Sequence, residues 1–578
     1  MRMAWRIGAP CLIALALAAC SDNGITDPDG PDGTCPVTEL LPGEHAVFEG
    51  AAAVDCIGLP AAAAGDEYEV VVTPLSRALA FNPMELRITA TGQSAASVPA
   101  VEVAAAQSVP GGTEIDRAWR AGQYPWDLAL RRLEQPLLPA IRANAARPGA
   151  GLFAVPAVGD TVEYGFSCIT AEDFPNAPSS ITGVVRALSG RAVVVEDTAA
   201  TGSFTGLEYE QIAANFDDPI YDTDVQYFGT PGDIDANGGR VVLLYAAGVN
   251  NLSENYNEAF VAGFTCPLDL GFAGGNDAEM FYLMVPDPTG AFTPAAGDGI
   301  TKDQVRRITD NTVAHEFQHM INAQSGNGGA QDVWINEGLS HIAEEVVGHA
   351  VNGFDPGTEL GPEELLSTQA RVDVFNKYYL NNWFNISQYL DAPGDTAALL
   401  NAEDPLDFNT FRMRGTAWMF LRYLLDRYED GSTAEAARTR ALVASSAGDS
   451  RDAVTQVFGA DFNRLATDWA TMLSVEDRSD VTPASALTLA SYRVRDVYES
   501  QIGTVLNPPS GGYPLVPKLR GLGVASTLDA ELFTGTGLYV TLRASAVAPA
   551  TELRLVAPGT GATLAESVQP RVTIVRID

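Results

Sequence analysis

The feature that most constrains this chain is a pair of histidines, His315 and His319, in the sequence HEFQH. Four residues turn an α-helix by about 400°, so the two rings lie about 40° apart and one turn along the axis. Both imidazoles can then reach one cation, provided that the segment is helical. Thr301 with Gln304 fits a capping box, and the apolar spacing predicts a helix over residues 302–323 with both histidines facing the core.

A second helix, predicted over residues 332–350, supplies a further ligand in Glu337. Two imidazole nitrogens, one carboxylate oxygen and one open position describe a catalytic zinc site, whereas four protein ligands close a structural site. Glu344, one heptad further on, is the alternative ligand. Glu316 is next to His315, so its carboxylate is expected to take a proton from a water molecule at the zinc and pass it to a leaving amine. This chemistry predicts peptide-bond hydrolysis.

Three segments resemble the gluzincin metallopeptidases, and among them the hyicolysin-like peptidases. They are HEFQHMINA at 315–323, NEGLSHIAEE at 336–345 and YFGTPGDIDANGGRVVLLY at 227–245. The resemblance covers residues 205–430. It implies a zincin-like catalytic domain with Zn2+ as cofactor and a protein or peptide as substrate. It also implies that the two histidines of HEFQH and the glutamate of the Asn-Glu pair bind the zinc, with the glutamate of HEFQH as the base.

Two departures from the gluzincin pattern bear on the reaction. Aminopeptidases of this group carry a Gly-x-Met-Glu-Asn strand that binds a free amino terminus. The corresponding segment Gly274–Met280 (GGNDAEM) lacks it, which favours an endopeptidase. The group also uses a Tyr or a His to stabilise the oxyanion. Arg414 stands at the matching position and is one candidate for this role; the other candidates are Tyr378, Tyr379 and Tyr389.

Two further features resemble parts of metal sites. His341 lies one turn after Glu337, where thermolysin-like sites hold a residue that orients a zinc histidine, and a surface histidine is the alternative interpretation. Asp233, Asp235 and Asn237 have the spacing of the first half of a calcium loop, but position twelve is leucine. We therefore expect either a Ca2+ site or an Asx-rich turn before the next strand.

The N-terminal residues 1–19 predict a lipoprotein signal peptide. Two arginines precede an apolar run that is shorter than the roughly 20 residues of a membrane-spanning helix. The run ends in Leu-Ala-Ala-Cys, which resembles the bacterial lipobox and implies lipidation of Cys20. Residues 20–34 are rich in Gly, Pro and Asp and predict a flexible tether. We therefore expect export and lipid anchoring at the bacterial cell envelope, at the outer membrane because Ser21 follows the cysteine.

Four cysteines remain beyond the signal peptide and Cys20. An even number in an oxidising compartment predicts two disulfides, and four cysteines allow three pairings. We favour Cys35–Cys56 within an N-terminal module and Cys168–Cys266 between a β segment and the catalytic part. Zinc binding by these cysteines is the alternative, and no Cys-x-x-Cys pair supports it.

Length and element pattern predict an α+β, multidomain protein. We expect a zincin-like catalytic domain, with a small mixed sheet, an active-site helix and a helical C-terminal subdomain, flanked by β-sandwich-like modules. The expected parts are an N-terminal β module at 35–105, a helical connector at 106–150, a small β segment at 151–200, the metallopeptidase domain at 201–480 and a C-terminal β-sandwich at 481–578. Residues 35–150 fit either a propeptide or a permanent module.

The net charge of −38 argues against nucleic acid as a partner, because phosphates would be repelled. Two other functions compete with the endopeptidase: a catalytically impaired surface-binding lipoprotein with a peptidase fold, and an aminopeptidase. The intact Glu316 favours an active enzyme.

Overall fold

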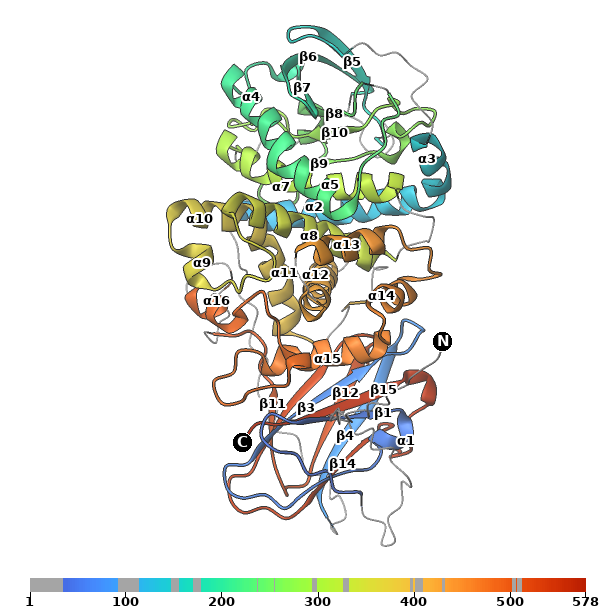
Figure 1. Cartoon of the computed structure of the whole chain (residues 1–578), viewed down its shortest axis with the longest axis vertical. Helices are drawn as coiled ribbons and strands as arrows, with labels where there is room; N and C mark the ends of the chain where they lie inside the picture. Colours follow the sequence, from blue (N-terminus) through green and yellow to red (C-terminus); the bar gives the residue numbers. More distant parts are fainter. Residues whose placement is uncertain are drawn as a thin grey trace, which may run out of the picture.

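The structure is a computed structural model with three parts, one above the other in Figure 1: a sheet covered by helices, a helical middle and a β-sandwich. It describes residues 35–91, 114–146, 155–169, 178–235, 237–253, 255–293, 299–325, 332–394, 399–400, 409–428, 432–501, 506 and 512–578. The predicted signal peptide, the lipidation of Cys20 and the tether lie outside the described residues and stay predictions.

The β-sandwich combines strands from the two ends of the described chain. One sheet has the strand order β1-β15-β3-β13-β11 and the other has the order β12-β4-β14-β2. The strands are β1 His45–Glu49, β2 Ile57–Leu59, β3 Glu67–Pro74, β4 Phe81–Ala90, β11 Lys518–Gly521, β12 Ser526–Phe533, β13 Leu538–Arg543, β14 Thr551–Val556 and β15 Pro570–Arg576. Apolar residues of both sheets, such as Val72 and Ile88, form one buried core.

The prediction of separate β modules at 35–105 and 481–578 is wrong, because both segments build the same two sheets. Strand β3 lies between β15 and β13, and β4 lies between β12 and β14. An alternation of apolar and polar residues identifies a strand but not its partner, so the sequence could not reveal this pairing. Since β3 and β4 are interior strands, they cannot be removed as a propeptide without loss of the sandwich.

A mixed sheet with the order β5-β6-β7-β8-β10-β9 forms the other β part of the described chain. Its strands are β5 Thr161–Gly165, β6 Ser180–Leu188, β7 Ala192–Asp197, β8 Val241–Tyr245, β9 Gly263–Phe264 and β10 Met280–Leu283. Strands β7, β8 and β10 are parallel, and the short β9 runs antiparallel to β10 at the edge. Because β7 pairs directly with β8, the predicted β segment at 151–200 is not separate: its strands form half of this six-stranded sheet.

Helices surround this sheet and fill the middle of the molecule (Figure 1). The α-helices are α1 Ala51–Val54, α2 Glu114–Glu134, α3 Leu138–Ala145, α4 Gly206–Asn215, α5 Asp222–Phe228, α6 Ala247–Asn250, α7 Lys302–Ser325, α8 Val333–Asn352, α9 Pro362–Leu366, α10 Gln369–Val374, α11 Leu380–Asp391, α12 Asn409–Arg427, α13 Ser432–Val443, α14 Ser450–Phe458, α15 Phe462–Val475 and α16 Val494–Ser500. The expected α+β architecture, with a mixed sheet and a helical subdomain, is confirmed.

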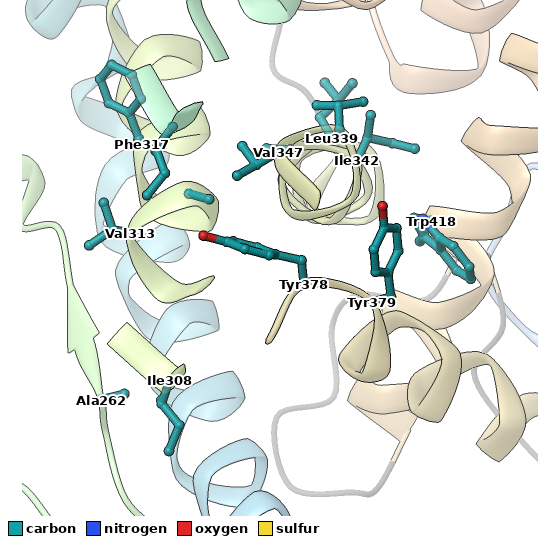
Figure 2. Close-up of a cluster of buried hydrophobic side chains, with 14 of the residues drawn as sticks. Ala262, Ile308, Val313, Phe317, Leu339, Ile342, Val347, Tyr378, Tyr379 and Trp418 are labelled. Atoms are coloured by element: carbon teal, nitrogen blue, oxygen red, sulfur yellow. The ribbon is translucent and has the colours of Figure 1, made fainter. Parts of the chain in front are cut away.

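Helices α7 and α8 correspond to the two helices predicted around the histidine motif. The predicted capping box is present at the start of α7, where Thr301 N–H donates to Gln304 Oε1 and Gln304 N–H donates to Thr301 Oγ1. Figure 2 shows Phe317 of α7 and Val347 of α8 in one apolar cluster, with Tyr378 between the two helices. This packing fixes the relative position of the side chains that the two helices carry toward the site.

Both favoured disulfides, Cys35–Cys56 and Cys168–Cys266, are confirmed. The second joins the turn after β5 to the residues after β9 and spans 98 positions of sequence. Among the described residues, none of the helices combines the length and the apolarity that a membrane span requires.

Candidate active site

Helices α7 and α8 bring His315, His319 and Glu337 to one point. The two Nε2 atoms of His315 and His319 are 3.2 Å apart. The carboxylate oxygens of Glu337 lie 3.3 Å from His315 Nε2 and 3.6 Å from His319 Nε2. All three side chains are buried. The residues predicted as ligands are therefore assembled around a common space between the two helices.

The imidazole rings of His315 and His319 are each hydrogen-bonded through the second ring nitrogen, Nδ1. His315 Nδ1 lies 2.8 Å from Glu344 Oε1, and His319 Nδ1 lies 3.0 Å from Asn336 Oδ1. A carboxylate or amide oxygen can only accept, so each Nδ1 carries a hydrogen, and each Nε2 is the nitrogen that faces Glu337. Glu344, the alternative ligand in the sequence analysis, therefore contacts Nδ1 of His315, whereas Glu337 lies against Nε2 of the same ring.

Glu316 lies beside this group on α7. Its carboxylate is 1% exposed, and neither oxygen has a hydrogen-bond partner among the described residues. The guanidinium of Arg131 approaches it, with Nη2 at 3.8 Å from Oε2. Burial, followed by the negative charge of Asp127, raises the pKa of Glu316 to about 8. Burial and Asp127 thus disfavour the charged form of this carboxyl, and Arg131 and His315 favour it.

Arg414, on α12, contacts the ligand group directly. Its Nη1 lies 2.6 Å from Glu337 Oε2, and its Nη2 lies 3.2 Å from Asp127 Oδ2. The guanidinium also stacks over Tyr124, with Cζ 4.0 Å from the ring centroid. Burial opposes the negative charge on Glu337, but Arg414 and His319 outweigh it and hold the pKa of Glu337 well below its usual range. The structure therefore places Arg414 in the site, and its role at the oxyanion stays a prediction.

The tyrosines named as alternatives to Arg414 pack among other side chains. Tyr378 and Tyr379 belong to the apolar cluster beside α8 in Figure 2. The ring of Tyr389 stacks on Trp469 of α15, with centroids 6.1 Å apart. These positions place their rings in the helical core.

His341 is buried and contacts both Glu344 and Arg414, which excludes the interpretation as a surface histidine. Its Nδ1 lies 3.1 Å from Glu344 Oε1, and its Nε2 lies 3.4 Å from Arg414 Nη1. His341 therefore supports the carboxylate that orients His315, and its effect on the ligand histidine passes through Glu344.

Helix α2 supplies site residues that the sequence analysis missed. The sequence predicts residues 106–150 only as a helical connector. Gln123, Asp127 and Arg131 are 2%, 1% and 1% exposed, although polar residues at helical spacing are typical of a solvated face. Periodicity alone cannot tell a buried polar stripe from an exposed one, so no sequence signal marked them.

The predicted calcium residues are only partly brought together. Asp233 and Asp235 converge with Glu279, which the sequence analysis missed. The amide nitrogen of Asn237 donates to Asp235, and its oxygen accepts the backbone N–H of Arg240. Asn237 therefore closes the Asx-rich turn and does not offer an oxygen to the acidic group. Calcium binding stays a prediction.

The donor set of the main site fits a zinc ion. Two imidazole Nε2 atoms and one carboxylate form the set of a catalytic zinc site, in which a fourth position is left for water or substrate. Their Nδ1 atoms are engaged by a carboxylate and an amide oxygen, the arrangement that orients ligand histidines.

The sequence matches no protein-family profile. Among curated proteins, the chain is similar to the neutral metalloprotease ShpI of Staphylococcus hyicus, with 26% identity over 212 residues. The relative is a metalloprotease. The match covers 34% of this chain and 44% of ShpI, so the chain spans less than half the length of this relative. The similarity and the motif resemblance point to the same class of protein, the metallopeptidases.

Replacement of Asn336 by alanine is expected to weaken zinc binding by about 10–100-fold, because His319 then loses the acceptor that fixes its tautomer and ring orientation. Asn336→Asp retains an oxygen at this place and is expected to bind zinc almost as well as the wild type. Competition with a chromogenic chelator measures both affinities. Equal affinities for the alanine variant and the wild type would contradict the orienting role.

Proposed function

We propose that the protein is a zinc-dependent endopeptidase in which Glu316 acts as the base. The observation that carries this proposal is the convergence of His315, His319 and Glu337 on one point, with Glu316 buried beside them. The similarity to ShpI supports the same class of enzyme.

Zinc held by these three ligands would supply Lewis-acid catalysis to a water molecule and to the scissile carbonyl group. Glu316 accepts the proton that the attacking water loses and delivers it to the nitrogen of the leaving amine. The water oxygen forms the new bond to the carbonyl carbon, the C–N bond breaks, and the amine leaves with its proton. Arg414 is the buried cation that contacts Glu337 and is our candidate for stabilising the oxyanion.

We propose cleavage within chains and not removal of N-terminal residues. The segment Gly274–Met280 lacks the strand motif with which related aminopeptidases bind a free amino group. Its glutamate, Glu279, accepts instead from Gln324 Nε2 at 2.7 Å and from the Ile234 N–H at 3.2 Å. This carboxylate is therefore engaged by the protein itself.

We also propose that the enzyme acts at the cell envelope, anchored through lipid on Cys20. The support is the lipobox-like sequence that ends at this cysteine. The full chain should enter the membrane fraction of the producing cell, and Cys20→Ser should release it. A soluble wild-type chain would contradict the anchor.

Removal of zinc is expected to abolish hydrolysis of casein, and added Zn2+ is expected to restore it, because the proposed site has three protein ligands and depends on the metal for its Lewis acid. The assay compares casein with aminoacyl reporters, on the purified chain and on its products of limited proteolysis. Hydrolysis that persists without metal would contradict the zinc mechanism. Cleavage of the aminoacyl reporters alone would overturn the endopeptidase assignment.

A further inference from the structure

The candidate active site is closed to a polypeptide substrate. The space beside His315 and Glu316 is a cavity of about 10 Å3, which is roughly the room that one water molecule occupies. Trp119, Gln123 and Tyr124, all on helix α2, line this cavity. Because an extended peptide requires a groove many times larger, the position of α2 is incompatible with substrate binding.

Gln123 makes the hydrogen bonds that a peptide group would make at the edge of the catalytic sheet. Its Oε1 accepts from the Ala262 N–H at 2.9 Å, and its Nε2 donates to the Gly263 carbonyl oxygen at 2.8 Å. These backbone groups lie at β9, the edge strand of this sheet in the described chain. Extended peptides bind proteins by pairing with exposed edge strands in this way. Helix α2 therefore occupies the hydrogen-bonding groups of Ala262 and Gly263, which would otherwise be open to the backbone of a substrate.

Charged residues of the same helix engage the proposed catalytic residues. Asp127 Oδ2 lies 3.2 Å from Arg414 Nη2, and Arg131 Nη2 lies 3.8 Å from Glu316 Oε2. The hydroxyl of Tyr124 is hydrogen-bonded to Asn381 Oδ1 at 2.8 Å. Successive turns of α2 thus contact the edge strand, the oxyanion candidate and the base.

Helix α2 packs closely against the backbone of the segment that precedes β9. A Cβ atom added at Gly122 would lie 2.3 Å from the backbone nitrogen of Phe260, far inside the contact distance of real Cβ atoms. The absence of a side chain at this position allows the helix to approach the segment that leads into β9. The contact is therefore specific to the present position of α2.

We propose that helix α2 is a built-in inhibitor that occupies the peptide-binding cleft, and that peptide hydrolysis requires its displacement. The inference rests on the proposed function, because it assigns the cleft to a peptide substrate. Strands β3 and β4, which precede α2, are interior to the sandwich, so the removable segment is the one that carries α2 and α3. Displacement exposes the edge of β9 and frees Glu316 and Arg414 from their α2 partners.

The first test excises this segment. Recognition sites for a sequence-specific protease are inserted at residues 100 and 150, and the cut protein is separated from the released peptide. Casein hydrolysis is expected to rise at least about 100-fold, as for a site that is open in roughly 1% of uncut molecules. A synthetic peptide of residues 114–146 is expected to inhibit the cut enzyme. A peptide hydroxamate, measured by calorimetry, is expected to bind the cut protein about 100-fold more tightly than the uncut one.

The two readouts separate this inference from the proposed function. Hydroxamate binding that strengthens only after cutting, without any peptide hydrolysis, would support the inhibitory role of α2 and contradict the proposed peptidase activity. Equal hydroxamate affinity before and after cutting would contradict the inhibitory role of α2, whether or not the protein hydrolyses casein. Hydrolysis by the uncut chain at the rate of the cut chain would overturn it as well.

A point variant keeps the test decisive if the cut protein does not stay folded. Gly122→Ala pushes α2 away from Phe260 in the uncut chain and is expected to speed hydroxamate binding and to raise casein hydrolysis. Gly206→Ala is the matched control, because it also lies in a helix but has no atom within 4 Å of the added Cβ. Equal hydroxamate binding rates in the two variants would overturn the inhibitor.

Discussion

Glu316→Gln is expected to lower kcat for casein hydrolysis by about 10^2–10^4-fold, the usual contribution of a positioned general base. Glutamine has the shape of glutamate but cannot accept the proton from the attacking water. Zinc content and hydroxamate binding are expected to stay at the wild-type level, because the three ligands are unchanged. The loss should therefore fall on kcat, with little change in KM.

Glu210→Gln is the control for this variant. Glu210 is an exposed glutamate of α4, so the same chemical change there is expected to leave hydrolysis unaltered. Both variants and the wild type are assayed in the same form, with α2 in place and after its excision. Equal activity of Glu316→Gln and the wild type in both forms would refute the mechanism. Loss of zinc from Glu316→Gln would assign its effect to metal binding and not to proton transfer.

Removal of the Cys168–Cys266 disulfide by two alanine substitutions is expected to lower the free energy of unfolding by about 4–5 kcal/mol. The bond closes a loop of 98 positions, and the entropy that a crosslink removes from the unfolded chain grows with loop length. Because the bond holds the end of β9, the largest increase in amide hydrogen exchange is expected in β9 and β10.

The second disulfide provides the comparison. Cys35–Cys56 closes 21 positions, so its removal is expected to cost about 3 kcal/mol and to increase exchange in the sandwich instead. Denaturant unfolding, with exchange measured by mass spectrometry, reports both the size and the place of each effect. Equal losses for the two pairs, or exchange changes in the same strands, would contradict the loop-length argument.

The sequence predicted the parts of the site that depend on local spacing. His315 and His319 lie on one helix, and the helix signal with its capping residues is contained within a few turns. Glu337 follows on the next helix, so the connection between the two restricts where it can lie. The disulfide pairing was accessible for a similar reason, since only three pairings of four cysteines exist.

The sequence could not predict contacts between distant segments. Asp127 and Arg414 are 287 positions apart, yet they form one buried ion pair at the site. An isolated charged residue on an amphipathic helix is normally expected on the surface, so α2 was described as a connector. The strand partners of the sandwich were missed for the same reason, because a period of two fixes which side chains face the core but not which strand lies alongside.

The shared sandwich has a consequence for the order of events during synthesis. Glu69 and Thr541, which are hydrogen-bonded across neighbouring strands, are separated by 472 positions. At about 5–20 residues per second, translation needs roughly 25–90 seconds to connect them. Strands β3 and β4 lack their partners until residues 526–576 are present, whereas all six strands of the other sheet lie between residues 161 and 283 and can pair earlier. Closure of the sandwich is thus a late step, and a chain that ends before residue 518 leaves β3 and β4 without the strands that flank them.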